Sequence, residues 1–195
     1  MFKRIFRKRR LKKDRSSIPT GLIPLRDIHS AAAVIDAAEA GWDSCVENVK
    51  AFCKASGISL TVLFIDMRKP GKKAGNLPDR QLTITRRDIN WFGRPRLKKA
   101  ALVTGKPVDL FLCLVDDDSY CIEYLSKSAK AMFKVGRRPF DGDPFDLIVA
   151  ESIPDTQDEP AGEEDTGTDI RQREPSGNIA EEIFGKIAEI ITKIG

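Results

Sequence analysis

The chain has 195 residues, of which 41% are hydrophobic and 32% are charged, and its formal net charge is +4. This length suffices for one compact domain with tails, and the composition is that of an ordinary globular protein. No apolar run reaches the roughly 18–20 residues that a membrane-spanning helix needs, so we expect no transmembrane segment.

The charge is distributed unevenly along the chain. Residues 1–15 hold nine Lys or Arg against Asp14 alone, whereas residues 151–174 hold nine acidic side chains against Arg171 and Arg173. The sequence therefore predicts a basic arm and an acidic segment on either side of a nearly balanced body. The basic start is not followed by the apolar stretch of a signal peptide, so we expect a cytoplasmic protein.

Residues 1–21 are expected to form a basic arm and linker in front of the domain. We expect the arm to be disordered, and a helix over residues 1–15 is the alternative. Large apolar groups, Phe2, Ile5 and Phe6, lie among the basic side chains of the arm. This combination suits RNA, a ribonucleoprotein or the anionic inner surface of a membrane, and a solubilising tail is the alternative. The candidate contact residues in the arm are Lys3, Arg4, Arg7, Lys8, Arg9 and Arg10.

Residues 22–152 predict an α/β domain. Residues 31–37 form an apolar run, apolar side chains then recur at helical spacing up to residue 53, and residues 58–66 are rich in strand-forming types. Strand, helix and strand in succession predict a parallel pair. Further strands are expected at residues 81–85, 110–115, 132–138 and 144–152, and helices at 97–103 and after residue 118. The fold class is therefore a three-layer, Rossmann-like or flavodoxin-like domain with a mostly parallel sheet.

Polar side chains fall at the expected carboxyl ends of these strands, where open α/β sheets bind ligands. Clustered carboxylates suit Mg²⁺, and arginines suit phosphate. The alternative is that Asp118 or Ser119 caps the helix that begins at Tyr120, while the other aspartates stabilise its positive end and the arginines lie in a solvated turn. The candidate ligand-binding residues are Asp66, Asp88, Asn90, Asp116, Asp117, Asp118, Arg137 and Arg138.

Residues 86–96, R-R-D-I-N-W-F-G-R-P-R, hold the most distinctive surface candidates. Trp91, Phe92 and Arg94 combine aromatic rings with a guanidinium, and this suits stacking on a base or contact with a protein partner. The alternative is that both rings pack into the core.

Catalytic and metal motifs are missing from the sequence. There is no P-loop, no dinucleotide-binding glycine pattern and no G-x-S-x-G. The single histidine is His29, and no two of the four cysteines form a C-x-x-C pair, so we expect buried free thiols, no metal and no cofactor. We therefore favour a protein without catalytic activity.

Residues 153–177 almost lack apolar groups and predict an acidic disordered linker. Residues 178–195 predict an amphipathic helix with one continuous apolar face. This face consists of Ile179, Ile183, Phe184, Ile187, Ile190, Ile191 and Ile194. We expect this face to dock on the domain. A protein partner that binds residues 178–194, or a homodimer seam there, is the alternative.

Several segments of the chain together resemble a known family. They are D-I-N-W-F-G-R-P at residues 88–95, V-D-L-F-L-C-L at 108–114, A-M-F-K-V-G-R at 131–137 and F-D-L-I-V-A at 145–150. The pattern resembles a bacterial family of uncharacterised proteins, a domain of unknown function whose members carry D-F-N-W-F-G-K-P-like and F-D-L-L-I-D-L segments. The resemblance implies an α/β fold and a cytoplasmic bacterial protein, but no activity. Cys113 stands where the family has an Asp in the strand, so an essential carboxylate there is not expected.

The leading functional hypothesis is a non-catalytic module that docks on an anionic partner through residues 1–15. One alternative is an enzyme or nucleotide-type ligand binder that uses the carboxylates and arginines at the strand ends. Another is a protein-interaction scaffold that uses the last helix.

Overall fold

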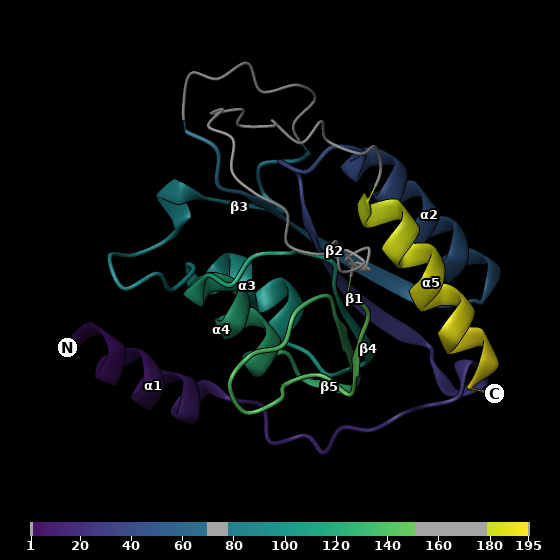
Figure 1. Ribbon diagram of the computed structural model, residues 1–195, viewed down its shortest axis with the longest axis horizontal. Coiled ribbons are helices and arrows are strands. Elements are labelled where there is room, and N and C mark those ends of the chain that lie inside the picture. Colours follow the sequence, from purple (N-terminus) through teal and green to yellow (C-terminus); the bar gives the residue numbers. More distant parts are fainter. Residues whose placement is uncertain (1, 70–77, 151–178, 195) are drawn as a thin grey trace, which may run out of the picture.

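The computed structural model describes residues 2–69, 78–150 and 179–194 (Figure 1). Six strands form one sheet in the order β3-β2-β1-β4-β5-β6, and every neighbouring pair is parallel. This confirms the predicted α/β fold. The strands are β1 Ser30–Asp36, β2 Ser59–Asp66, β3 Thr83–Thr85, β4 Val108–Cys113, β5 Ala131–Gly136 and β6 Leu147–Ile148.

Helices cover both faces of the sheet and make three layers. Helices α2 (Trp42–Ala55) and α5 (Ile179–Lys193) lie on one face, and α3 (Leu97–Thr104) and α4 (Tyr120–Ser128) lie on the other (Figure 1). Two short 3₁₀ helices, η1 (Leu25–Asp27) and η2 (Arg86–Asp88), precede β1 and follow β3. Within the described ranges, no helix has the length and apolar character needed to cross a bilayer.

Strand β4 is apolar from Leu110 to Cys113, because each of its faces contacts a helical layer there. Leu112 belongs to the hydrophobic cluster under α2 and α5, whereas Phe111 and Cys113 belong to the cluster under α3 and α4. All three side chains are buried. Strands β1 and β4 are neighbours at the centre of the sheet, so the chain leaves their carboxyl ends in opposite directions, as in the doubly wound dinucleotide-binding folds.

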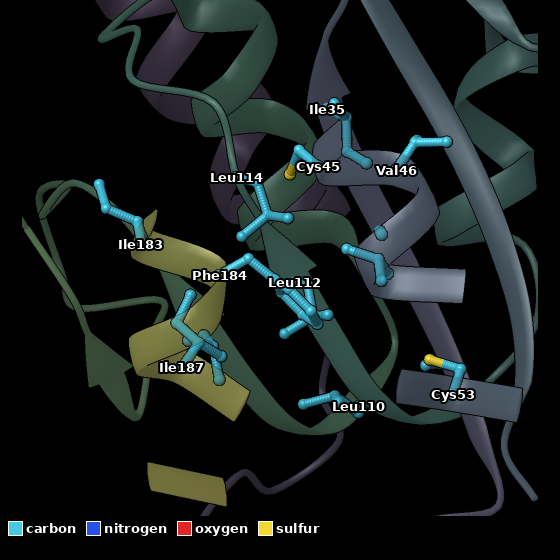
Figure 2. Packing of buried hydrophobic residues seen from close by; sticks show 14 of the residues in the cluster. Ile35, Cys45, Val46, Cys53, Leu110, Leu112, Leu114, Ile183, Phe184 and Ile187 are labelled. Carbon is cyan, nitrogen blue, oxygen red and sulfur yellow. The ribbon is translucent and has the colours of Figure 1, made fainter. Parts of the chain in front are cut away.

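The last helix packs its apolar face on the domain. Phe184 of α5 points toward Leu112, and Ile183 and Ile187 belong to the same buried cluster (Figure 2). The ring of Phe184 meets that of Phe52 in α2 edge to face, with centroids 5.9 Å apart. Helix α5 is therefore part of the fold. The expected acidic linker at residues 153–177 lies outside the described residues.

The basic arm differs from the expectation of disorder. Residues 2–14 form helix α1 (Phe2–Asp14), which lies outside α4 on the side of the sheet opposite α2 and α5 (Figure 1). Leu11 is buried in the cluster under α3 and α4. The chain after α1 stays on the domain, because the backbone N–H of Ser16 donates to the carbonyl of Lys127. These contacts offset the entropy lost when the arm is ordered.

Candidate functional site

Residues 88–96 form a closed loop with an aromatic tip. The backbone N–H of Gly93 donates to the carbonyl of Asn90 at 2.8 Å, and Asn90 Oδ1 accepts the N–H groups of Phe92 and Arg94, each at 3.0 Å. Asn at the first position and Gly at the last are favoured in such four-residue turns. The turn leaves Trp91 at an outer position, where it is 73% exposed. The alternative of two core rings is therefore wrong for Trp91, and Phe92 is half-buried.

The base of this loop is held by Asp88, one of the predicted ligand residues. Asp88 Oδ2 accepts the N–H and the hydroxyl of Thr85 and lies 2.7 Å from Lys99 Nζ. The N–H of Arg96 donates to the carbonyl of Asp88 at 2.7 Å, which closes the loop. Burial raises the pKa of Asp88, but the hydrogen bonds from Lys99 and Thr85 outweigh it and hold the pKa below its ordinary value. The carboxylate of Asp88 is therefore held by Thr85 and Lys99, and these contacts account for its position without a ligand.

Helix α1 docks on the loop through Phe6 and Arg7. The rings of Phe6 and Phe92 stack with centroids 5.6 Å apart and planes 19° from parallel. Arg7 Nε donates to the carbonyl of Phe92 at 2.6 Å, and the Arg7 guanidinium lies 4.8 Å from the ring centroid of Tyr120 in α4. Arg7 thus joins the helix, the loop and α4.

Gly93 permits this close approach. Its φ of 94° lies in the left-handed region that side chains with a Cβ rarely adopt. A Cβ built on Gly93 would lie 2.8 Å from Arg7 Nη2 and 3.4 Å from the Tyr120 side chain. The glycine in W-F-G-R is therefore required both by the turn and by the position of Arg7.

A pocket of about 220 Å³ lies between α1 and the loop. Three aromatic rings line it, those of Phe6, Phe92 and Tyr120, and its polar lining comes from Arg7, Arg10, Arg94 and Asn90. The pocket thus combines ring faces with guanidinium groups.

Asp14 partly neutralises this pocket. One of its carboxylate oxygens lies 2.9 Å from Arg10 Nε and 2.9 Å from Arg94 Nη2. The positive charge of two of the three lining arginines is therefore matched by one carboxylate. The sequence did not reveal this role, because Asp14 is eighty residues away from Arg94 along the chain.

The outward face of α1 mixes rings with cations. Phe2, Phe6, Arg9 and Lys13 follow one another at i, i+4, i+7 and i+11, so they share one stripe of the helix. All four are exposed, as are Ile5, Lys8 and Lys12. Lys3 and Arg4 belong to the same helix. We call the surface formed by α1 and residues 88–96 the basic-aromatic surface.

The predicted ligand residues at the strand ends are distributed over several separate places. Asp66 forms a bidentate pair with Arg68, at 2.9 and 3.0 Å, and the hydrogen bond from Arg68 lowers the pKa of Asp66. Asp116 lies 3.3 Å from Arg138, and Asp118 is exposed. Asp66 and Asp116 thus each have a charged partner within the described residues. Of the eight predicted residues, Asp116 and Arg137 line one cleft, and Asn90 and Asp117 line another.

The start of α4 only partly follows the capping expectation. Ser119 stands at the N-cap position, but its side chain makes no capping hydrogen bond. Asp117 Oδ1 instead accepts the backbone N–H of Ser119 at 3.0 Å. Asp117 therefore orders the turn between β4 and α4.

A second cleft lies where β1 and β4 end. It measures about 300 Å³ and is lined by Asp36, Glu39, Asp116 and Arg137, among others. Arg137 is 5% exposed, and its Nη1 donates to both Glu39 oxygens, at 2.9 and 2.8 Å. Burial raises the pKa of Asp36, and neighbouring carboxylates raise it further.

Asp36 and Glu39 were not among the ligand residues predicted from the sequence. Asp36 directly ends a buried strand, which is the same signal that singled out Asp66. Glu39 carries no such signal, because its role depends on Arg137, which is 98 residues away.

The remaining titratable groups give no metal centre in the described part of the chain. No group of three or more His, Cys, Asp or Glu side chains is placed there to hold a metal ion. The four cysteines are buried and unpaired. Burial raises the pKa of the thiols to about 12 in Cys45 and Cys121 and to about 11 in Cys53 and Cys113, so they are poor nucleophiles.

The fold and the surface together define a class: a doubly wound α/β domain with a docked basic helix and an aromatic loop. Within this class, the chain belongs to the family of unknown function DUF6913, whose model matches residues 2–158. This confirms the resemblance to an uncharacterised family. A search of curated proteins and a search of solved structures each gave no match.

Proposed function

We propose that the protein is a non-catalytic cytoplasmic module that docks on single-stranded RNA through the basic-aromatic surface. The observation that carries the proposal is the stack of Phe6 on Phe92, beside the exposed ring of Trp91. Two segments far apart in sequence thereby present aromatic rings at one place, and arginines lie between them.

The cations supply the part of the interaction that does not depend on sequence. Lys8, Arg9, Lys12 and Lys13 are exposed, and none of them forms an ion pair within the described residues. Such cations bind phosphates and thereby release the counterions of the nucleic acid. Aromatic rings beside them can stack on any of the bases. A strand of RNA offers both chemical groups in alternation.

An anionic membrane is the competing partner. A helix that adsorbs on a membrane separates its apolar face from its charged face. In α1, Arg9 and Lys13 share a stripe with Phe2 and Phe6, so charge and rings are interleaved instead. Interleaving favours RNA, although Ile5 would suit a membrane.

The test compares two quadruple variants of the full chain. One replaces Lys8, Arg9, Lys12 and Lys13 of α1 with Gln, and the matched control replaces Lys50, Lys54, Lys186 and Lys193, which are exposed on α2 and α5. Both lose the same charge, but from opposite sides of the sheet. Binding to a labelled oligouridylate is measured by fluorescence anisotropy across a salt series.

The α1 variant should bind more weakly, and the log–log salt slope should fall by about 0.7 for each phosphate contact that is lost. The control should bind like the unmodified chain. If RNA binding weakens equally in both variants, the effect comes from net charge alone. That result would contradict binding through the basic-aromatic surface. If the chain binds vesicles with anionic lipids but not RNA, the membrane is the partner and the RNA proposal is wrong.

A second candidate function is a small-ligand or catalytic site in the cleft at the ends of β1 and β4. The raised pKa of Asp36 beside Glu39 and Arg137 is the observation that favours it. A saturable stabilisation by Mg²⁺ that Asp36→Asn abolishes would support this candidate over the binding module. The scaffold hypothesis needs a free apolar face on the last helix, and that face is packed on α2 and the sheet.

A further inference from the structure

We infer that the pocket between α1 and the 88–96 loop takes one unstacked base, so that the protein selects single strands over duplexes. This inference rests on the proposed function and names the ligand group of the same surface. It can fail while RNA binding itself stands.

The walls of the pocket suit a flat ring. Phe6, Phe92 and Tyr120 come from α1, the loop and α4, and together they supply most of its apolar lining. Phe6 and Phe92 stack on each other with centroids 5.6 Å apart, so a base would lie beside this pair of rings and not between them. A space of about 220 Å³ admits one planar heterocycle but not a stretch of double helix.

Three arginines and Asp14 leave the pocket a net charge of +2, but each of these arginines already has a partner in the fold. Asp14 pairs with both Arg10 and Arg94, and Arg7 Nε is already bonded to the carbonyl of Phe92. The free cations lie outside the pocket, on the exposed face of α1. A strand would therefore place its phosphates along that face and turn a base inward.

Two of the lining residues, Asn90 and Arg94, each keep a donor that is not used within the described residues. Asn90 uses Oδ1 for the turn, and its amide nitrogen has no bond within the described residues. Arg94 Nε is buried and likewise has no partner there. Asn and Arg side chains are common donors to base edges.

Selectivity for single strands follows from this arrangement. A paired base lies inside the double helix, where neither its faces nor its pairing edge can reach a protein pocket, so recognition needs an unpaired one. The basic face of α1 attracts any nucleic acid, whereas the pocket adds affinity only for strands that can place an unpaired base in it.

The experiment compares three probes on the full chain. They are an oligouridylate, a strand of the same length and charge whose bases are removed, and a duplex of half the length, which carries the same number of phosphates. The oligouridylate should bind about five- to 150-fold more tightly than the abasic strand, the range expected for one stacked base. The duplex should show no such gain over the abasic strand when the two are compared at high salt, where the contribution of the phosphates is small.

Phe6→Ala and Phe2→Ala form the matched pair of variants. Both residues are exposed on α1, but only Phe6 lines the pocket. Phe6→Ala should remove the preference for the oligouridylate, Phe6→Tyr should keep it, and Phe2→Ala should leave it unchanged. Thermal unfolding of each variant establishes that the fold is retained.

Equal affinity for the oligouridylate and the abasic strand would overturn the base pocket, while the proposed RNA binding would stand. The same conclusion follows if Phe2→Ala and Phe6→Ala reduce the preference equally. If none of the probes binds, the proposed RNA binding is wrong, and the base pocket is wrong with it.

Discussion

Arg7 Nε lies 2.6 Å from the carbonyl oxygen of Phe92, and this hydrogen bond joins two segments that are 85 residues apart. It orders the basic helix on the domain at the place where the aromatic loop projects. The cations of α1 and the rings of the 88–96 loop therefore form one surface. This surface depends on the contact between Arg7 and Phe92.

Replacing Arg7 with Gln should loosen α1 from the domain. The substitution removes a charged hydrogen bond and the contact with Tyr120, which together stabilise the fold by about 1–3 kcal/mol. Hydrogen exchange should accelerate across residues 2–14. Arg9→Gln on the exposed face is the control and should leave exchange unchanged. Unaltered protection in the Arg7 variant would contradict the docking of α1.

Gly93→Ala should destabilise the protein by about 1–3 kcal/mol, because alanine is strained at a φ of 94° and its Cβ would displace Arg7. Gly21→Ala provides the comparison, since a Cβ there meets no atom within 4 Å. Urea unfolding measures both variants. The same stability in both would be incompatible with the turn described here.

Phe184→Ala should lower the free energy of unfolding by about 3–5 kcal/mol, because the ring is 3% exposed and packs on Phe52. Lys186→Ala, on the exposed side of the same helix, should change it little. A small effect of Phe184→Ala would mean that α5 is not part of the cooperative core.

The stability of the protein should depend on pH through Lys134. The side chain is 3% exposed, and burial lowers its pKa from 10.5 to about 8. Between these values the unfolded chain binds more protons at this site, so stability from Lys134 rises with pH across the window. Below pH 8 the buried lysine is charged in the folded state, and this lowers the free energy of unfolding by about 3 kcal/mol.

Lys134→Met should therefore be more stable than the unmodified chain near neutral pH, and this difference should shrink as pH rises from 8 to 10.5. The comparison between the two proteins cancels the opposite contribution of the buried cysteines, whose raised pKa values favour the folded state only at lower pH. Lys130→Met, at an exposed site, is the control. A difference that stays constant over this range would show that Lys134 keeps an ordinary pKa.

Much of the fold follows from local pattern. Strand β4 is apolar at every core position because both of its faces are covered, and the amphipathic period of residues 179–194 matches the packed face of α5. The strand order of the sheet depends on contacts between distant segments, so it cannot be predicted from local sequence patterns.

The candidate surface was predicted in two separate halves. The aromatic residues of the loop and the cations of the arm each stand out by composition, but the sequence does not show that they meet. Arg7 and Phe6 have no local feature that separates them from Arg9 and Phe2. Their roles arise from Tyr120 and Phe92, which are brought to α1 only by the fold.

The emission of Trp91 tests the central claim most directly. The chain has two tryptophans, and Trp42→Phe removes the other one, whose ring packs on Phe64. Titration of this variant with an oligouridylate should quench the emission of Trp91 in a saturable manner that salt weakens, because a base stacks beside the loop. Unchanged emission with the oligouridylate, together with a blue shift on vesicles of anionic lipid, would contradict RNA docking and assign the surface to a membrane.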